Sequence, residues 1–140
     1  MRLDRRFRCA LYATFAVLFG TGSGWLLADR MKEEAFGAGE AWQTAAANLI
    51  MVHGGAAMIT LLLLGGLVPL HIQRAWRRGR NRLTAAAMLA TNGLLIVTSF
   101  GLYYAGSELL RHWTSNIHIG LGLCLPVIFF LHVLVGRYRS

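Results

Sequence analysis

Four histidines lie within long apolar segments of this 140-residue chain. His53 and His71 lie in one segment, and His118 and His132 lie in another. Imidazole binds metals and carries protons near neutral pH, so these four rings are the residues most able to do chemistry. A polar ring is costly in hydrocarbon and rare there, so each histidine needs a bonding partner or a function.

The segments around these histidines are long enough to cross a membrane. The chain is 56% hydrophobic and only 14% charged, whereas about a quarter of the residues in a soluble domain are charged. Each apolar run can span a hydrocarbon core of about 30 Å as a helix rising about 1.5 Å per residue. Short loops after the second and third runs, and a longer loop over residues 29–45, predict one integral-membrane domain over residues 1–140, an all-α, up-down four-helix bundle. The predicted helices cover residues 9–28, 46–72, 84–105 and 113–136.

The charges alternate from loop to loop. The net charge is +8, and most arginines lie before the first run, between the second and third runs, and at the C-terminus. The loop between the first and second runs and the loop between the third and fourth runs hold most of the acidic residues. This pattern follows the positive-inside rule and predicts that both termini are cytoplasmic. It also explains the basic character without a nucleic-acid partner. The arginines of the cytoplasmic segments are Arg2, Arg5, Arg6, Arg8, Arg74, Arg77, Arg78, Arg80, Arg82, Arg137 and Arg139.

The predicted topology makes the two histidine-bearing helices parallel, so their histidines pair by level. His53 and His118 lie nearer the outer side, and His71 and His132 lie nearer the cytoplasm. Eighteen residues, about five full turns, separate His53 from His71, so these two histidines share a face of their helix. Fourteen residues separate His118 from His132, which places them about 40° apart around theirs. Each helix then presents both rings to one side. This arrangement predicts two stacked b-type haems, bound non-covalently, with iron held between two histidines in each.

The vertical spacing is unequal. The histidines are about 27 Å apart along the first of these helices and about 21 Å apart along the second. Tilt, a kink at Pro69, or an irregularity near Gly65 and Gly66 would have to absorb the difference. His112 lies about 160° around the helix from His132 and in a polar segment, so we expect it at the interface and not on iron.

Other residues on these helices suit a haem. Glycines would leave flat space beside the ligands. Cationic or hydroxyl groups would bind the propionates, and Thr114, Asn116 or a freed carbonyl would bind the second ring nitrogen of a ligand. The candidate glycines are Gly54, Gly55, Gly65, Gly66, Gly120 and Gly122. The candidate propionate partners are Tyr104 and Arg111 on the outer side, and Arg74 and Arg77 on the inner side.

Two other functions use the same histidines. They could be relay groups of a haem-free, proton-coupled transporter or of a structural membrane subunit, although a carrier should also have a membrane carboxylate and broken helices. Zinc or copper would favour nearby cysteines or carboxylates.

Cys9 and Cys124 lie in different runs, where we expect them to be small buried residues. No C-x-x-C-H motif occurs, which excludes a c-type haem.

The segment from about Asn48 to Arg137 resembles the small bacterial four-helix b-type cytochromes. The strings that carry this resemblance are Val52-His53-Gly54, Pro69-Leu70-His71, Arg80-Asn81-Arg82-Leu83, Gly101-Leu102-Tyr103-Tyr104-Ala105-Gly106, His118-Ile119-Gly120 and Leu131-His132-Val133-Leu134-Val135-Gly136-Arg137. The chain is also similar to the larger cytochrome b subunits of respiratory complexes, in which two helices each give two haem ligands.

The resemblance implies electron transfer in the bacterial inner membrane between the quinone pool and a redox partner. The chain carries no flavin motif or nucleotide fingerprint. We therefore expect a relay module that cannot complete a reaction on a soluble substrate alone. Any enzymatic role would need another redox protein or a second copy of this chain.

Overall fold

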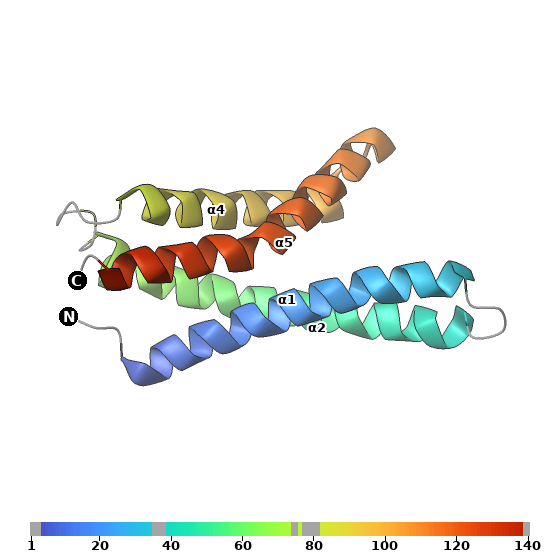
Figure 1. Ribbon diagram of the computed structural model, residues 1–140. Helices are drawn as coiled ribbons and strands as arrows, with labels where there is room; N and C mark the ends of the chain where they lie inside the picture. The colour runs from blue at the N-terminus through green and yellow to red at the C-terminus, as the bar shows by residue number, and fades with distance from the viewer. Residues whose placement is uncertain (1–3, 35–38, 74–75, 77–81, 139–140) are drawn as a thin grey trace. The chain divides into compact units, whose positions relative to one another are not determined.

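The described part of the chain is built from four long helices. A computed structural model describes residues 4–34, 39–73, 76 and 82–138, without the side chains of residues 33, 34, 70, 71 and 137. All regular secondary structure in these ranges is helical (Figure 1), which confirms the predicted all-α, four-helix fold. Each long helix is long and apolar enough to cross a membrane, as in a multi-pass membrane protein. The elements are α1 (Arg5–Glu34), α2 (Gly39–Leu67), the π-helix η1 (Val68–Ile72), α4 (Arg82–Tyr104) and α5 (Glu108–Tyr138).

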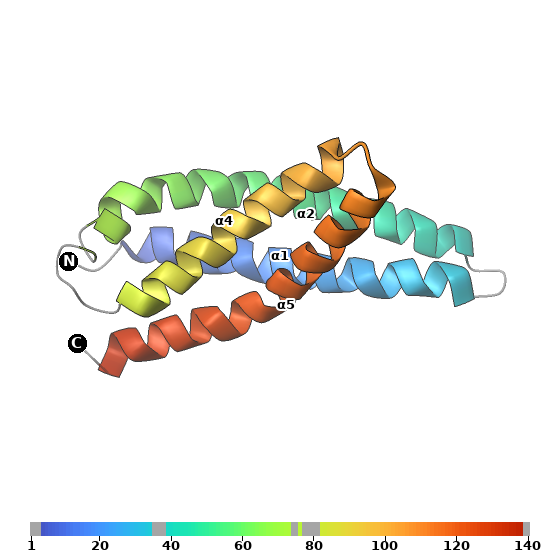
Figure 2. The ribbon, with the colours of Figure 1, turned by 90° about the horizontal axis from the view of Figure 1, so that it is seen from above.

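The chain divides into two compact units, Met1–His71 and Ile72–Ser140. Each unit is a hairpin of two antiparallel helices. In the first, α1 and α2 lie side by side in both views, and in the second α4 packs along α5 (Figures 1 and 2). Each hairpin therefore supplies one histidine-bearing helix and one neighbour that contacts it.

Small residues let α1 and α2 approach closely. Ala28, Ala46 and Ala56 are buried at their contact. Gly24 leaves room for the Leu49 side chain, whose methyl carbons lie 3.4 and 3.5 Å from where a Cβ of residue 24 would be. Close approach through small residues is typical of helices packed in lipid, where dispersion replaces the hydrophobic effect between helices.

The C-terminal end of α2 widens into the π-helix η1, which contains Pro69. Proline has no backbone N–H and its ring collides with the carbonyl four residues earlier, so the α-helical hydrogen-bond ladder is interrupted there. A wider turn with i→i+5 bonds is one way to continue the helix past this break. The sequence suggested a kink at Pro69 as one way to absorb the unequal histidine spacing, and the structure has a π-helix, Val68–Ile72, at this proline.

The turn between α4 and α5 is closed by polar contacts. The Arg111 guanidinium donates to the Ala105 carbonyl over 3.1 Å, just beyond the last residue of α4. The backbone N–H of Arg111 also donates to the Ser107 carbonyl at the start of α5. Further along, α5 contains Pro126 and bends midway along its length (Figure 1). Proline is the usual cause of such a bend.

The helices extend further than predicted, and the cysteines are less buried. The loop expected over residues 29–45 is mostly helix, because α1 continues to Glu34 and α2 begins at Gly39. Polar and charged residues continue these helices beyond the apolar runs, so apolar patterning cannot mark where the helices end. Cys9 and Cys124 are exposed on their units, so the expectation that they are buried is wrong.

Gly101 of the second hairpin should tolerate a side chain poorly. A Cβ at this position would lie 2.9 Å from Cγ2 of Thr114, a buried and stiff β-branched side chain. We expect Gly101→Ala to lower the free energy of unfolding by about 1–3 kcal/mol through overpacking. Denaturant titration of the detergent-solubilised protein measures it. Gly93→Ala is the control, because nothing described lies within 4 Å of that Cβ. Equal stability of both variants would contradict this packing.

Candidate functional site

His53 is held against the neighbouring helix of its own hairpin. The ring is half-buried on α2, and its Nδ1 lies 3.0 Å from the Thr21 hydroxyl oxygen on α1. Gly22, the next residue on α1, makes room for it. A Cβ there would lie 3.2 Å from the ring Cε1. The His53 ring therefore has a defined orientation that depends on two consecutive residues of α1.

The Thr21 hydroxyl decides which ring nitrogen carries the proton. Its single hydrogen is directed to the Val17 carbonyl four residues earlier, with 2.6 Å between the oxygens. Threonine commonly bonds back to its own helix in this way. The hydroxyl must then accept at the contact with His53, so Nδ1 is the donor. A neutral imidazole with the proton on Nδ1 has its metal-binding lone pair on Nε2.

His118 makes the same contact in the second hairpin. Its Nδ1 lies 2.9 Å from the Thr98 hydroxyl oxygen on α4. The Thr98 hydroxyl donates back to the Leu94 carbonyl, at 2.7 Å. The proton of His118 therefore also belongs on Nδ1. Two histidines, one from each hairpin, thus share the same hydroxyl partner type, the same ring nitrogen and the same tautomer.

His132 repeats the contact further along α5. Its Nδ1 lies 3.1 Å from the Thr84 hydroxyl oxygen on α4. Fourteen residues separate Thr84 from Thr98, and fourteen separate His118 from His132. Two heptads bring both members of each pair to one seam of a packed helix pair. The two histidines therefore contact the same helix in one antiparallel register.

The position of His71 is described only through its backbone. It lies in η1, and its side chain is outside the described residues. The angular relation of His53 to His71 was calculated for unbroken α-helix. A π turn holds more residues and rotates each one by less, so that calculation does not carry across η1. His71 as a ligand, and its pairing with His132, stay predictions. The pairing of His53 with His118 joins residues of two different units and also stays a prediction.

His112 differs from the other described histidines. It is exposed on α5, and its Nε2 lies 3.1 Å from the side-chain nitrogen of Asn116, one turn away on the same helix. The amide nitrogen is the donor, so this contact uses the lone pair of Nε2. Asn116, which we considered as a partner of a ligand histidine, thus bonds His112. Thr114 donates to the Leu110 carbonyl, at 2.7 Å.

The glycines proposed to make space fall into two groups. At Gly55, Gly65, Gly120 and Gly122, nothing in the described ranges lies within 4 Å of an added Cβ. Gly66 instead packs against the Phe7 ring, at 3.7 Å, and Gly54 is half-buried on α2. Packing within one hairpin therefore does not explain the first group. Gly122 lies one turn from His118 on the same face of α5, so the space beside His118 is open there, whereas Gly120 lies on nearly the opposite face.

The predicted propionate partners are only partly described. Arg111 is exposed and already donates to the Ala105 carbonyl, although a guanidinium has five donors. Tyr104 is exposed at the end of α4, with its ring 4.5 Å from that of Phe100. Arg74 and Arg77 lie outside the described residues. Their role as propionate partners stays a prediction.

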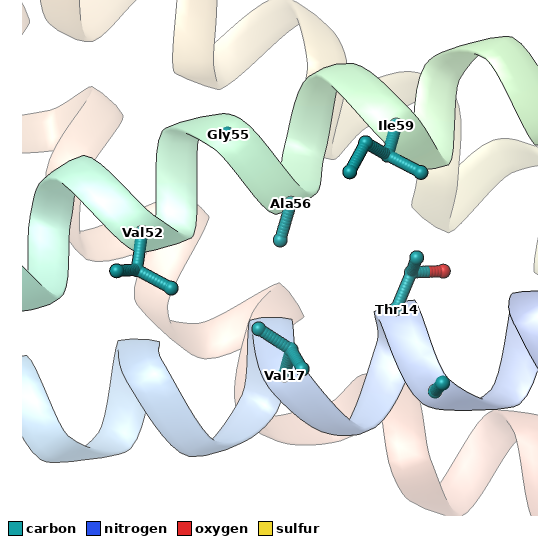
Figure 3. A pocket seen from close by; sticks show the side chains of 7 residues that line it. Thr14, Val17, Val52, Gly55, Ala56 and Ile59 are labelled. Atoms are coloured by element: carbon teal, nitrogen blue, oxygen red, sulfur yellow. The ribbon is translucent and has the colours of Figure 1, made fainter.

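An open, wholly apolar cavity of about 380 Å³ lies between α1 and α2 (Figure 3). Small side chains of the two helices, such as Ala56, leave this space. No histidine lines it, so the cavity is distinct from the ligand candidates. The lining residues are Ala13, Thr14, Val17, Val52, Gly55, Ala56 and Ile59.

Sequence reasoning did not identify the threonines that hold the rings. The signal was present in α4 and α5, where two threonines and two histidines have the same fourteen-residue spacing. In the first hairpin no second spacing marks Thr21. Its contact with His53 depends on how α1 and α2 are aligned with each other, and the spacing of residues within one helix does not give that alignment.

No match is found for this chain among protein-family models, curated proteins or solved structures. In the described part of the chain, no three or more histidine, cysteine, aspartate or glutamate side chains come together around a common point. A bis-histidine haem takes only two ligands from the protein, so it needs no such group.

Gly22→Ala should disturb the His53 ring, whereas Gly20→Ala should not. The new methyl at position 22 would press on Cε1 from 3.2 Å, and nothing described lies within 4 Å of one at position 20. We expect the imidazole ¹⁵N resonances of His53 to shift in Gly22→Ala as its bond to Thr21 lengthens. Solid-state NMR of the labelled protein in bilayers measures this. Unchanged His53 resonances in Gly22→Ala would contradict the described contact.

Proposed function

We propose that this chain is a di-haem b-type cytochrome that relays electrons across a membrane. The observation that supports it best is the common state of the described ligand candidates. His53 and His118 each place Nδ1 against a threonine hydroxyl that already donates to its own helix, which favours a proton on Nδ1, and His132 also contacts a threonine through Nδ1. Metal-bound histidines almost always have this arrangement, with the second nitrogen donating to a fixed acceptor.

The residues present fit the cofactor. Haem iron in such a protein takes two neutral imidazoles, and Nε2 of both His53 and His118 carries the lone pair needed. The rings lie in apolar helices long enough to span a membrane, and Gly122, one turn from His118 on the same face, leaves open space. In the proposal His53 and His118 bind the outer haem, and His71 and His132 bind the inner one.

The residues of this chain would bind the haems, orient them and separate them from water. When bound, haem supplies one-electron chemistry at iron, which no side chain of this protein can provide. The four histidines would fix the position of each haem relative to the membrane. Apolar side chains around them would keep the local dielectric low, and the ligand set and its hydrogen bonds would tune the potential. Arg111, Tyr104 and Arg74 would bind propionates on the two sides.

The proposed setting is the bacterial inner membrane with both termini in the cytoplasm. Support comes from the arginines at the ends of the spans that the positive-inside rule assigns to that side. We propose quinone as one redox partner, and a separate redox protein or a second copy of the chain as the other. The arginine-rich inner face would attract an acidic protein domain or anionic lipid.

The alternative is a haem-free, proton-coupled transporter or a structural subunit. A proton relay passes through a chain of ionisable groups. The contacts of His53 with Thr21 and of His118 with Thr98 do not form such a chain, because each hydroxyl proton is held by a backbone carbonyl of its own helix. This pattern fixes a proton in place and favours the role of metal ligand.

Substitution of single histidines should remove the haems selectively. We expect His53→Ala or His118→Ala to remove the outer haem and retain most of the inner one, because either substitution removes one of the two histidines assigned to the outer haem alone. His71→Ala or His132→Ala should do the reverse. Redox titration followed in the visible spectrum separates the two haems and measures the content of each.

The control for these substitutions is His112→Ala. This histidine bonds Asn116 on its own helix, so its removal should leave the haem content near the wild-type value. Equal loss of haem from all five variants would show a folding defect instead of lost ligation, and would count against this assignment of ligands.

Quinone exchange is tested in liposomes that contain quinol and this protein alone. We expect rapid reduction of the haems, because a membrane-embedded relay would take electrons directly from the quinone pool. Absorbance of the reduced α-band follows the reaction. Complete inertness to quinols, with reduction only by a flavoprotein on the inner face, would remove quinone from the proposal.

A further inference from the structure

The threonines beside the histidines have a more specific role than filling the helix contacts. Thr21 and Thr98 each use their hydrogen on a carbonyl of their own helix and turn the hydroxyl oxygen toward a histidine of the neighbouring helix. A valine has nearly the same shape and could fill the same space. A requirement for threonine at these positions would therefore come from the hydrogen bond that its hydroxyl oxygen accepts from the histidine, and not from packing.

We infer that Thr21, Thr98 and Thr84 are positioning residues that set the tautomer and donor strength of the haem ligands. This inference rests on the proposed function. Each threonine would hold the Nδ1 proton, direct the lone pair of Nε2 to iron, and keep the ring from rotating. For Thr84 the carbonyl four residues earlier belongs to Arg80, which lies outside the described residues.

The effect on iron follows from the hydrogen bond. An Nδ1–H that donates to a good acceptor leaves more electron density on Nε2, so the imidazole becomes a stronger donor. A stronger donor favours the ferric form over the ferrous form and lowers the reduction potential. By this assignment Thr21 and Thr98 act on the outer haem, through His53 and His118. Thr84 acts on the inner haem, through His132.

The chain offers a matched control on α4. Thr91 lies seven residues from both Thr84 and Thr98, on the same seam, and only 6% of its surface is exposed. The α5 residue at the corresponding place, seven residues from both His118 and His132, is Leu125. Thr91→Val therefore tests the cost of losing a buried hydroxyl from this helix contact without the loss of a histidine bond.

The experiment compares Thr98→Val, Thr98→Ser and Thr91→Val in the haem-loaded protein. We expect Thr98→Val to weaken haem binding at one site by about 10–100-fold, the usual cost of losing the second partner of a metal ligand. The potential of that haem should rise. Thr98→Ser retains the hydroxyl and should restore both quantities, and Thr91→Val should match the wild type. Thr84→Val should act on the other haem.

A second measurement needs no haem. Imidazole ¹⁵N spectra of the haem-free protein report which nitrogen is protonated. We expect His118 to hold its proton on Nδ1 in the wild type and to lose this preference in Thr98→Val. Wild-type protein with the proton on Nε2 would overturn the inference.

The outcomes separate the inference from the proposed function. Wild-type protein that binds no haem would overturn the proposed function, while the ¹⁵N spectra would still test the threonine contacts. Wild-type protein that binds two haems, with Thr98→Val indistinguishable from Thr91→Val in affinity and potential, would overturn the inference alone.

Discussion

A polar ring in a membrane span must have its hydrogen bonds satisfied by the protein, because the surrounding lipid offers none. In this chain the threonine hydroxyl meets that requirement. It donates to its own helix and accepts from the histidine of the next helix. One interaction thus satisfies the Nδ1 side of the ring, favours one tautomer and links the two helices of a hairpin. The small residues along each seam serve it too, because they bring the helices close enough for a short hydroxyl to reach the ring.

The hydrogen bonds also constrain the register of each hairpin. In the second hairpin two histidine–threonine contacts, fourteen residues apart on both helices, fit one antiparallel alignment. A slip of α5 by one residue would break both contacts together. Neutral hydrogen bonds contribute only about 0.5–1.5 kcal/mol each, but a buried polar group left without a bond costs about 1–3 kcal/mol. The penalty for misalignment therefore exceeds the gain from either bond.

The four membrane-length helices could be predicted from the sequence, because apolar length is a property of each segment by itself. The location of the histidines within these helices follows from the same segments. The helix ends could not be predicted, since α1 and α2 continue through polar residues as far as Glu34 and from Gly39. The π-helix Val68–Ile72 could not be predicted, because a proline in a span indicates only that the helix is disturbed there and not which kind of turn continues it. Thr21 could not be identified, because its contact with His53 depends on how the loop sets the register between two helices. Thr84 and Thr98 could have been found, since their spacing equals that of His118 and His132.

The central claim is that these histidines are haem ligands. The most direct measurement is the pyridine haemochrome assay on purified protein, expressed with an adequate supply of haem and quantified against protein concentration. The proposal predicts two b-type haems per chain, both released by acidified acetone because neither is covalently attached. Folded protein with no b-type haem would contradict it.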